Sequence, residues 1–295
     1  MDSATQSLHN LLRERVDQLV ADHNYDEAIH AASAAVEKAQ HSLTSDPDSI
    51  DAFVGALELR AELFRSLQRM DEARDDYKQA IDQLDNRDDR SLQMARLHAT
   101  YGALQDEMGH PERAAELWKK ALELFEAAEP PAPLDVILMA NNIAYVTKAD
   151  GNFDDAETYF LKALELSHQT LGSDHEETAT VSNNLGALYL SSGYFEQARE
   201  MHMMALEARR KSLGDAHPDT AQSHNNLALA LLETGDRSWA RRHFEKAMAI
   251  YEDLGRAYLP DLEAVSSNYC AFLREEGEES SAERVESLVR DIATR

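Results

Sequence analysis

Side-chain amides that recur at a fixed interval are the feature of this sequence best suited to molecular recognition. Asparagine costs about 0.6 kcal/mol against alanine in a helix interior, yet runs such as "SNNLGALYL" place two of them in an otherwise apolar stretch. A carboxamide carries both hydrogen-bond donors and an acceptor, so a row of them could bind the N–H and C=O groups of an extended peptide. The row repeats every 42 residues and consists of Asn142, Asn184, Asn226 and Asn268.

Twelve histidines raise the question of a metal or catalytic site. His175 and His217 lie 42 residues apart in the segments between repeats, where a capping or packing role is favoured over metal ligation. His202 occupies an aromatic position and is expected to be a core or half-buried residue. His217, His224 and Asp219 could be imagined as ligands, but their spacing does not match a helical histidine pair at i, i+4. We therefore predict no metal site.

The rest of the sequence also lacks the marks of an enzyme. Its glycines are isolated and form no G-x-G-x-x-G phosphate-binding loop. Carboxylates at the surface of helices are no evidence for acid–base catalysis unless they are buried. The single cysteine, Cys270, offers neither a disulfide nor a metal-binding spacing, and is most simply a small buried residue. These observations predict a protein without catalytic residues and without a cofactor.

Charge and composition restrict the class of partner. The chain has 295 residues, and 29 Lys and Arg against 55 Asp and Glu give a net charge of −26. Such a field repels nucleic acid and anionic lipid surfaces, which need clustered basic residues. The favoured interpretation is a surface kept soluble by self-repulsion; attraction to a basic peptide or protein is the alternative. No apolar run approaches a membrane span and the N-terminus lacks the pattern of a signal peptide, which predicts a cytoplasmic protein.

A 42-residue period organises the chain. Glycines and alanines recur together at this interval, and upstream Ala73 and Ala28 continue the alanine series with looser spacing. Seven units of about 42 residues account for essentially the whole chain, so residues 1–295 are predicted to form one repeat stack without a second domain. The recurring residues are Gly109, Gly151, Gly193, Gly235 and Gly277, with Ala114, Ala156, Ala198, Ala240 and Ala282.

Each unit is predicted to be a helix, a tight turn and a second helix. In residues 181–190 the apolar side chains fall on one helical face, "SSG" interrupts, and the helical period resumes at Phe195. The recurring glycine supplies the left-handed conformation that ends the first helix. The sequence thus predicts an all-α protein of about fourteen helices and no strands, in which each hairpin buries its apolar face against its neighbours.

These positions resemble the tetratricopeptide repeat (TPR), whose signature is a Leu-Gly…Tyr first helix followed by an Ala…Phe…Ala second helix. The linker "LGDAHPDTAQSHNNLALALLETGD" (213–236) is similar to those of kinesin light chains and of many bacterial proteins, and favours a bacterial protein. The resemblance implies an α-solenoid, a right-handed superhelix of about seven helical hairpins. It is specific across 91–277, weaker in the divergent N-terminal repeats of 1–90, and ends in a C-terminal capping helix at 278–295.

The same resemblance assigns a surface to the asparagine row. First helices line the concave inner face of a TPR stack, and in the family an asparagine at this point contacts bound peptide. An architectural alternative remains open, in which these amides satisfy free carbonyls at the ends of neighbouring helices; Asn141, Asn183 and Asn225 are expected to do this. The residues that would flank the groove are Tyr145, Thr180, Gln222, Leu229 and Arg274.

The neighbours of the row restrict the ligand. TPR versions that bind a C-terminal carboxylate have lysine four residues before the asparagine, and without a cation there a carboxylate would be poorly paired. This chain instead has Leu138, Thr180, Gln222 and Ala264. Three residues after the row, an apolar floor is formed by Tyr145, Ala187, Leu229 and Ala271. A peptide with apolar anchors and basic flanks is therefore expected.

The sequence favours a non-enzymatic interaction scaffold or adaptor that binds a protein partner, as an extended peptide or a helix, in the concave groove. The alternative is a regulatory or assembly factor that uses its convex face or its ends, with self-association into a homo-oligomer through a terminal repeat. An enzyme is the least favoured class.

Overall fold

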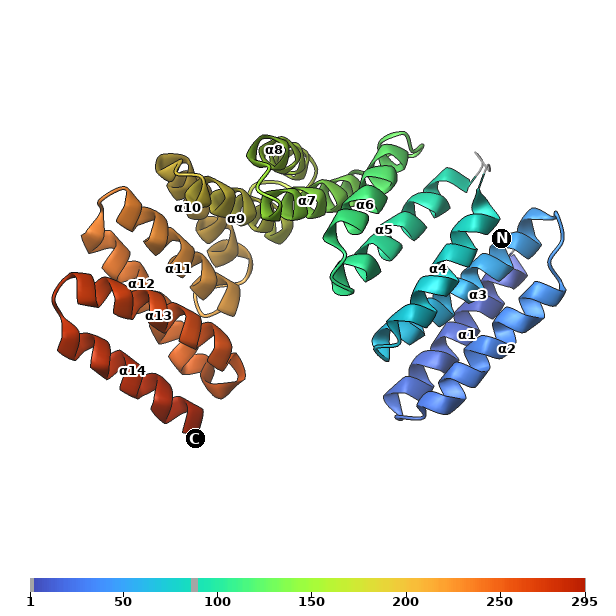
Figure 1. Cartoon of the computed structure of the whole chain (residues 1–295), viewed down its shortest axis with the longest axis horizontal. Helices are drawn as coiled ribbons and strands as arrows, with labels where there is room; N and C mark the ends of the chain where they lie inside the picture. Colours follow the sequence, from blue (N-terminus) through green and yellow to red (C-terminus); the bar gives the residue numbers. More distant parts are fainter. Residues whose placement is uncertain (1–2, 86–89, 295) are drawn as a thin grey trace. The chain divides into compact units, whose positions relative to one another are not determined.

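A computed structural model describes residues 3–85 and 90–294 of the chain. These residues form α-helices, one short 3-10 helix and no strand, which confirms the predicted all-α architecture (Figure 1). The elements are α1 (Ser3–Ala21), α2 (Tyr25–His41), α3 (Pro47–Ser66), α4 (Met70–Leu84), α5 (Ser91–Glu107), α6 (Pro111–Glu126), α7 (Pro133–Ala149), α8 (Phe153–Thr170), α9 (Glu176–Ser191), α10 (Phe195–Ser212), α11 (Pro218–Glu233), α12 (Arg237–Leu254), η2 (Gly255–Tyr258), α13 (Leu259–Glu275) and α14 (Glu279–Thr294).

The turn glycines end the first helices in the way the sequence predicts. Gly193 has φ +81° between α9 and α10, and the N–H of Tyr194 donates to the carbonyl of Tyr189 at 2.9 Å. This bond closes the helix end through a left-handed residue. In the N-terminal repeats Gln68 takes the same place with φ +60°, and the N–H of Arg69 donates to the carbonyl of Phe64 at 2.8 Å. The turn geometry is therefore retained where glycine is absent.

Histidines cap the first helices of two repeats. The Nδ1 of His175 accepts from the N–H of Glu177 at 3.1 Å, and the Nδ1 of His217 accepts from the N–H of Asp219 at 3.2 Å. Each bond satisfies an N–H that the first turn of a helix leaves free. The predicted capping role of these histidines is confirmed.

Small residues allow the two helices of a repeat to approach closely. A Cβ added to Gly186 on α9 would lie 2.8 Å from the ring of His202 on α10, and one added to Gly102 would lie 2.6 Å from Trp118. His202 and Cys270 are both buried, as expected from their positions in the repeat. The core is therefore built from large rings set against small first-helix residues.

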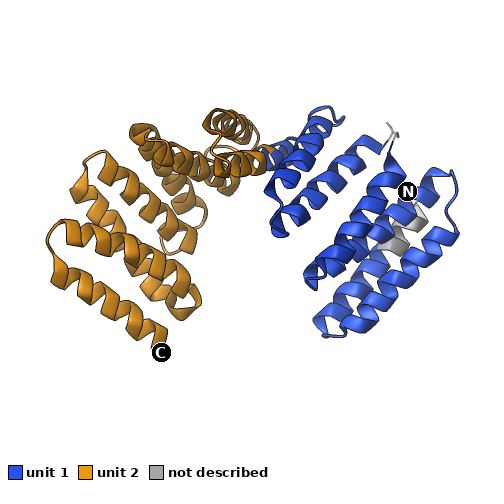
Figure 2. Ribbon diagram, viewed as in Figure 1, with its two compact units in different colours: residues 1–139 blue, residues 140–295 orange. Residues whose placement is uncertain are grey.

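Interatomic contacts divide the chain into two compact units, residues 1–139 (unit 1) and 140–295 (unit 2) (Figure 2). The core of unit 1 includes Phe53, Leu57 and Tyr77. The core of unit 2 includes Phe244 and Phe272, whose ring centroids are 6.0 Å apart. Among the described helices, none combines the length and apolar character needed to cross a bilayer.

Candidate functional site

The first helices of unit 2 reach solvent along one narrow stripe. On α9, residues 178, 179, 181–183, 185, 186, 188 and 189 are buried, and the accessible positions follow the i, i+4, i+7, i+11 spacing of a single helical face. The same positions are accessible on α11 and α13. We call this surface the ladder face; it consists of Thr180, Asn184, Ala187 and Ser191, then Gln222, Asn226, Leu229 and Glu233, then Ala264, Asn268, Ala271 and Glu275.

Hydrogen bonds between asparagines connect successive repeats. The Nδ2 of Asn184 donates to the Oδ1 of Asn141 at 3.0 Å. The equivalent bonds run from Asn226 to Asn183 at 2.9 Å and from Asn268 to Asn225 at 3.1 Å. The second asparagine of each repeat therefore reaches back to the first asparagine of the repeat before it. Both positions of the recurring pair are required for this bond.

This arrangement resolves part of the architectural alternative. Asn183 and Asn225 are almost fully buried, and they accept from side-chain amides, so the expectation that they bind helix-end carbonyls is wrong. The ladder amides are only partly buried. Because a carboxamide has two N–H donors and an acceptor oxygen, Asn184 and Asn268 each use one donor in the bond between repeats. The second donor and the oxygen of each of these two amides make no further side-chain hydrogen bond among the described residues.

Contacts between helices give unit 2 its curvature. The first helices α9 and α11 contact each other directly, as do α11 and α13. Within the described part of unit 2, the second helices α10, α12 and α14 make no contact with one another of comparable extent. A two-layer stack whose first helices lie closer together must curve toward them, so the ladder face lies on the inner side of unit 2.

The predicted flanking residues differ in their availability. Tyr145 is 60% exposed, and Thr180 and Leu229 are partly exposed on the ladder face. The guanidinium of Arg274 instead donates to Glu279 at 3.1 Å and to Glu286 at 2.7 Å. Its charge is therefore paired within the last repeat, where Glu286 takes the place of an aromatic residue.

Arg209 is a buried cation that the sequence interpretation missed. It is 5% exposed, and its Nη1 donates to the carbonyl of Asp219 at 3.0 Å, to Gln222 Oε1 at 3.1 Å and to Ser223 Oγ at 3.0 Å. Burial lowers the pKa of this guanidinium. Gln222, four residues before Asn226, is itself uncharged, but the guanidinium of Arg209 on the preceding second helix, α10, bonds its side chain. Tyr251 occupies the equivalent position on α12, but its hydroxyl donates to the Pro218 carbonyl of α11, the first helix of its own repeat, so the 42-residue period gives no signal for the contact that Arg209 makes with the next repeat.

The ladder face differs in charge from the opposite side of the hairpins. Nine of its twelve members, the first three positions on each helix, are uncharged, and at the fourth position only Glu233 and Glu275 carry charge. The exposed residues of α10 and α12 are mostly charged and include Glu200, Glu207, Arg210, Arg242, Glu245, Lys246, Glu252 and Asp253. In a chain of net charge −26, the ladder face is a neutral surface of amides and small apolar groups.

Histidine and carboxylate groups do not assemble into a metal site in the described residues, where no cluster of three or more candidate ligands occurs. His217 is used as a helix cap, while the Nδ1 of His224 lies 2.7 Å from the Nδ1 of His243. Burial, with the neighbouring His243, lowers the pKa of His224 to about 3. The two rings therefore form a neutral hydrogen-bonded pair between α11 and α12.

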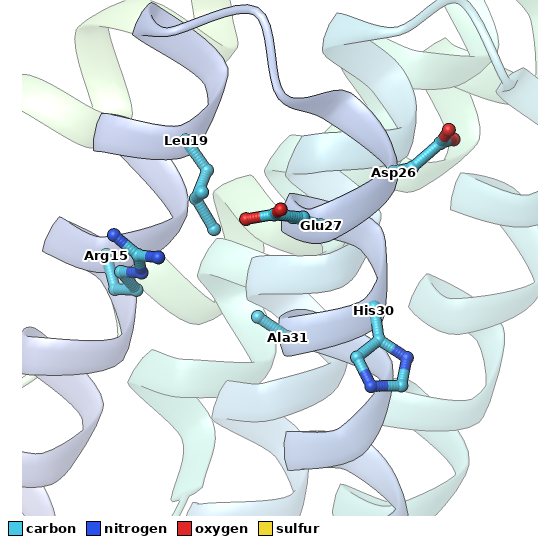
Figure 3. Close-up of a pocket in the computed structure, with 6 residues that line it drawn as sticks. All are labelled: Arg15, Leu19, Asp26, Glu27, His30 and Ala31. Atoms are coloured by element: carbon cyan, nitrogen blue, oxygen red, sulfur yellow. The ribbon is translucent and has the colours of Figure 1, made fainter.

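A pocket of about 400 Å³ lies between α1 and α2 in unit 1 (Figure 3). Its polar side chains come from both helices, and only Leu19 and Ala31 give it an apolar base. Cofactor sites are usually enclosed, whereas this pocket is open to solvent, so it has little in common with them. The lining residues are Arg15, Leu19, Asp26, Glu27, His30 and Ala31.

Comparisons with known proteins decide the family. One tetratricopeptide repeat model matches residues 51–127, 135–211 and 192–253, and a second matches residues 13–88. The chain belongs to the tetratricopeptide repeat family. The fourteen helices of its described residues form seven TPR hairpins, and TPR proteins are generally non-enzymatic scaffolds for protein–protein interaction. A comparison with curated protein sequences found no match.

Solved structures support the same TPR fold. BtubC (BKLC) from P. vanneervenii is 27% identical with a TM-score of 0.67, over 78% of this chain and 92% of that one. A kinesin-light-chain-like protein of Podosopora anserina with nearly identical TPR-like repeats is 20% identical with a TM-score of 0.59, over 69% and 95%. A TPR protein of Cytophaga hutchinsonii is 15% identical with a TM-score of 0.62, over 95% of both chains. At 20% and 15% identity, the Podosopora anserina and Cytophaga hutchinsonii structures show only that this chain shares their fold.

Proposed function

We propose that this TPR protein is a non-enzymatic scaffold or adaptor that binds an extended peptide, or a helix of a protein partner, along the ladder face. The binding residues are the amides of Asn142, Asn184, Asn226 and Asn268 with the apolar residues beside them. The proposal treats residues 1–295 as one repeat array in the cytoplasm, with residues 278–295 as its cap.

The observation that carries this proposal is the neutral, amide-bearing stripe on the inner side of a strongly acidic molecule. Solvated faces of this chain carry charge, as α10 and α12 do. The ladder face keeps Asn184, Asn226 and Asn268 at the same point of three successive helices, and leaves part of their hydrogen-bonding capacity unused. Because the bonds between repeats hold these amides in place, little side-chain entropy would be lost on binding.

The chemistry around the amides favours a particular kind of peptide. Ala187, Leu229 and Ala271 give shallow apolar positions that suit small or flat apolar anchors. Glu233 lies at the exposed end of the stripe, where it would attract basic flanking residues. Glu275 at the same end is already paired with Arg237 at 3.1 Å. Arg274 is already paired with Glu279 and Glu286. Acidic residues that flank the anchors of a bound peptide would therefore find no free cation at this position.

An experiment can test the ladder face without removing the bonds between repeats. Ala187→Arg with Ala271→Arg would place two long cations on the stripe, while Ala249→Arg makes the same change on an exposed position of α12. Arginine is a good helix former, so all variants should fold. We expect partners captured by the wild type to be lost with the double variant and kept with the control. Equal capture by all three proteins would remove the ladder face as the binding site.

The opposite face supports a second candidate function, assembly through the outer surface. Trp239 on α12 is 54% exposed and has the guanidinium of Arg242 4.9 Å from its ring. Met203 on α10 is 47% exposed. Self-association through these residues would make the molecular mass depend on concentration in light scattering and would be weakened by Trp239→Ser. A monomer at all concentrations would exclude it.

A further inference from the structure

Three aromatic rings and a carboxylate meet where α8, α9 and α10 join in unit 2. The rings of Phe153 and Tyr194 stack with their centroids 5.2 Å apart, and the ring of Tyr189 lies 6.3 Å from Phe153 and 6.2 Å from Tyr194. The hydroxyl of Tyr189 donates to Glu157 Oε1 at 2.7 Å. These four residues therefore form one cluster, which we call the aromatic junction.

The aromatic junction is open to solvent. Tyr194 is 47% exposed, and Phe153 and Glu157 are half-buried. Tyr189 is the buried member of the cluster. Because almost half of Tyr194 remains accessible despite its ring contacts, a side chain from outside can reach the cluster.

Glu157 is a carboxylate without a cation. Among the described residues its side chain accepts one hydrogen bond, from Tyr189, and it makes no ion pair. Burial, and then the bond to Glu157, raises the pKa of Tyr189, so this hydroxyl keeps its proton and remains the donor. A carboxylate accepts bonds at about four lone-pair sites, so most of the accepting capacity of Glu157 is unused.

The two later junctions of unit 2 carry ion pairs at the equivalent positions. Arg199 and Arg241 stand 42 and 84 residues after Glu157. The Nη1 of Arg199 donates to Asp236 at 3.4 Å, and the Nη1 and Nη2 of Arg241 donate to Glu278 at 3.2 and 2.6 Å. Each pair joins a second helix to the turn of the following repeat. A cation and a carboxylate therefore meet at this place in both repeats.

The aromatic junction lacks the cation of these pairs. Tyr194 precedes Asp236 and Glu278 by 42 and 84 residues, so it stands where the later repeats have the carboxylate. Glu157 stands where they have the guanidinium. The described chain thus supplies an acceptor and an exposed ring at this junction, but no cation bonded to Glu157.

We propose that the aromatic junction binds the guanidinium group of an arginine side chain from a protein partner. The guanidinium nitrogens bond the free oxygen of Glu157, and the planar face of the group stacks on the exposed ring of Tyr194. None of the four residues belongs to the ladder face, so the site does not depend on the function proposed for that face.

The chain combines the same groups at places where it supplies its own arginines. The Cζ of Arg241 lies 5.2 Å from the centroid of the Phe272 ring while its nitrogens bond Glu278. The Cζ of Arg69 lies 4.6 Å from the Phe64 ring while its nitrogens bond a glutamate of α4. Arginine suits such a site better than lysine, because its guanidinium is planar and presents its donors in a fixed geometry.

Charge also favours a basic partner at this site. The exposed carboxylates of Asp154, Asp155 and Glu196 stand within two residues of its members in the sequence, and the whole chain has a net charge of −26. Such a potential attracts cations and raises their rate of association. A neutral or acidic side chain would gain none of this and would leave Glu157 unpaired.

The test uses the full chain with ¹³C-labelled tyrosine rings. The resonances of Tyr189 and Tyr194 are followed during titration with acetyl-Gly-Arg-Gly-amide, with the citrulline tripeptide, which has nearly the same shape and no charge, and with the lysine tripeptide. We expect the arginine peptide to shift both resonances with a dissociation constant of about 1–10 mM, and the citrulline peptide to shift neither. The lysine peptide should bind at least about threefold more weakly, because an ammonium has no planar face to stack.

Variants locate the site. Glu157→Gln keeps an acceptor for the Tyr189 hydroxyl and removes the charge, so it should weaken arginine-peptide binding about tenfold. Glu200→Gln, at an exposed carboxylate of α10, should leave binding unchanged. Tyr194→Ser should weaken binding about threefold, followed at the Tyr189 resonance. Tyr25→Ser removes a tyrosine of similar exposure in unit 1 and should not weaken it.

A double variant tests the site in a protein with its own cation restored. Glu157→Arg with Tyr194→Asp installs the ion pair that Arg199 and Asp236 make one repeat later. It should keep the circular dichroism spectrum and melting temperature of the wild type and bind the arginine peptide more than about tenfold more weakly, because an internal guanidinium occupies the site.

Four results would overturn the proposal. They are undiminished binding by Glu157→Gln or by the folded double variant, equal shifts with the citrulline peptide, no shift at about 10 mM arginine peptide, and a shift of the Tyr194 resonance when the protein concentration is raised without peptide. The last result would make a second copy of this chain the occupant of the site.

Discussion

The Nδ2 of Asn226 donates a hydrogen bond to the Oδ1 of Asn183 at 2.9 Å, and this bond joins the first helices of two successive repeats. Asn184 and Asn268 make the equivalent bonds. The paired asparagines of the sequence thus have a physical explanation. The second asparagine of a pair donates a hydrogen bond to the preceding repeat, and the first accepts one from the following repeat. The bond also fixes the accessible amide in one orientation, so stacking of the repeats and presentation of the ladder face depend on the same groups.

We predict that Asn226→Ala destabilises the protein by about 1 kcal/mol, because it removes a hydrogen bond between repeats and leaves the Asn183 oxygen with fewer donors. Denaturant unfolding followed by circular dichroism measures the change. Gln197→Ala, at an exposed position of α10, is the control and should remain within about 0.5 kcal/mol of the wild type. The same midpoint for Asn226→Ala and the wild type would mean that the bond between repeats contributes nothing to stability.

Gln68 provides a prediction of the opposite sign. It holds φ +60° at the turn between α3 and α4, a conformation that costs a residue with a Cβ roughly 1–2 kcal/mol. We expect Gln68→Gly to stabilise the protein by about 0.5–1 kcal/mol, since part of the relief is offset by the greater entropy of glycine in the unfolded chain. Gln197→Gly inside α10 should instead destabilise it by about 1 kcal/mol. A lower melting temperature for Gln68→Gly would show that this turn is not strained.

The contact between α9 and α10 makes Gly186 sensitive to a single methyl group. Gly186→Ala would set a Cβ 2.8 Å from the His202 ring, and such overpacking typically costs about 1–3 kcal/mol. Adding His202→Ala to this variant makes room for the methyl group, so the double variant should lose less than the sum of the two single losses. Additive losses would indicate that the ring and the added methyl group do not compete for space.

The repeat period predicted the fold because the same alanine position recurs in all seven helical hairpins. Gly193 and its equivalents mark the turns, and Gly186 with His202 marks a close approach between helices. These are local requirements of a helical hairpin, and each can be read from residue type and spacing. The turn at Gln68 shows the limit of this method, because the backbone keeps its conformation where the diagnostic glycine is missing.

Side-chain partners were harder to predict than positions. The sequence assigns Asn183 to a junction, but only the structure shows that it accepts from Asn226. Arg274 was predicted to flank the groove as a cation, yet it pairs with Glu279 and Glu286. Arg209 was overlooked because it extends from a second helix to Gln222 on the next first helix. Such pairings depend on side-chain reach between elements, which periodicity does not encode.

The burial of His202 gives the last prediction, on the effect of acid. Burial, with the charges of Lys148 and Arg209, lowers the pKa of His202 to about 4 from an ordinary value near 6.5. The native state therefore holds a neutral ring, while the unfolded chain binds a proton as the pH falls below 6.5. The contribution of His202 to the free energy of unfolding is therefore fully present above pH 6.5 and is lost between about pH 6.5 and 4.

His202→Phe places the aromatic found at Phe160 and Phe244 in this position and removes the titrating group. We expect the variant to lose less stability than the wild type between pH 7 and 4, by on the order of 2–3 kcal/mol, in denaturant melts across this range. Some acid sensitivity should persist, because His224 and His243 also have lowered pKa values. Parallel stability curves for the two proteins would show that His202 accepts a proton as readily in the native state as in the unfolded chain.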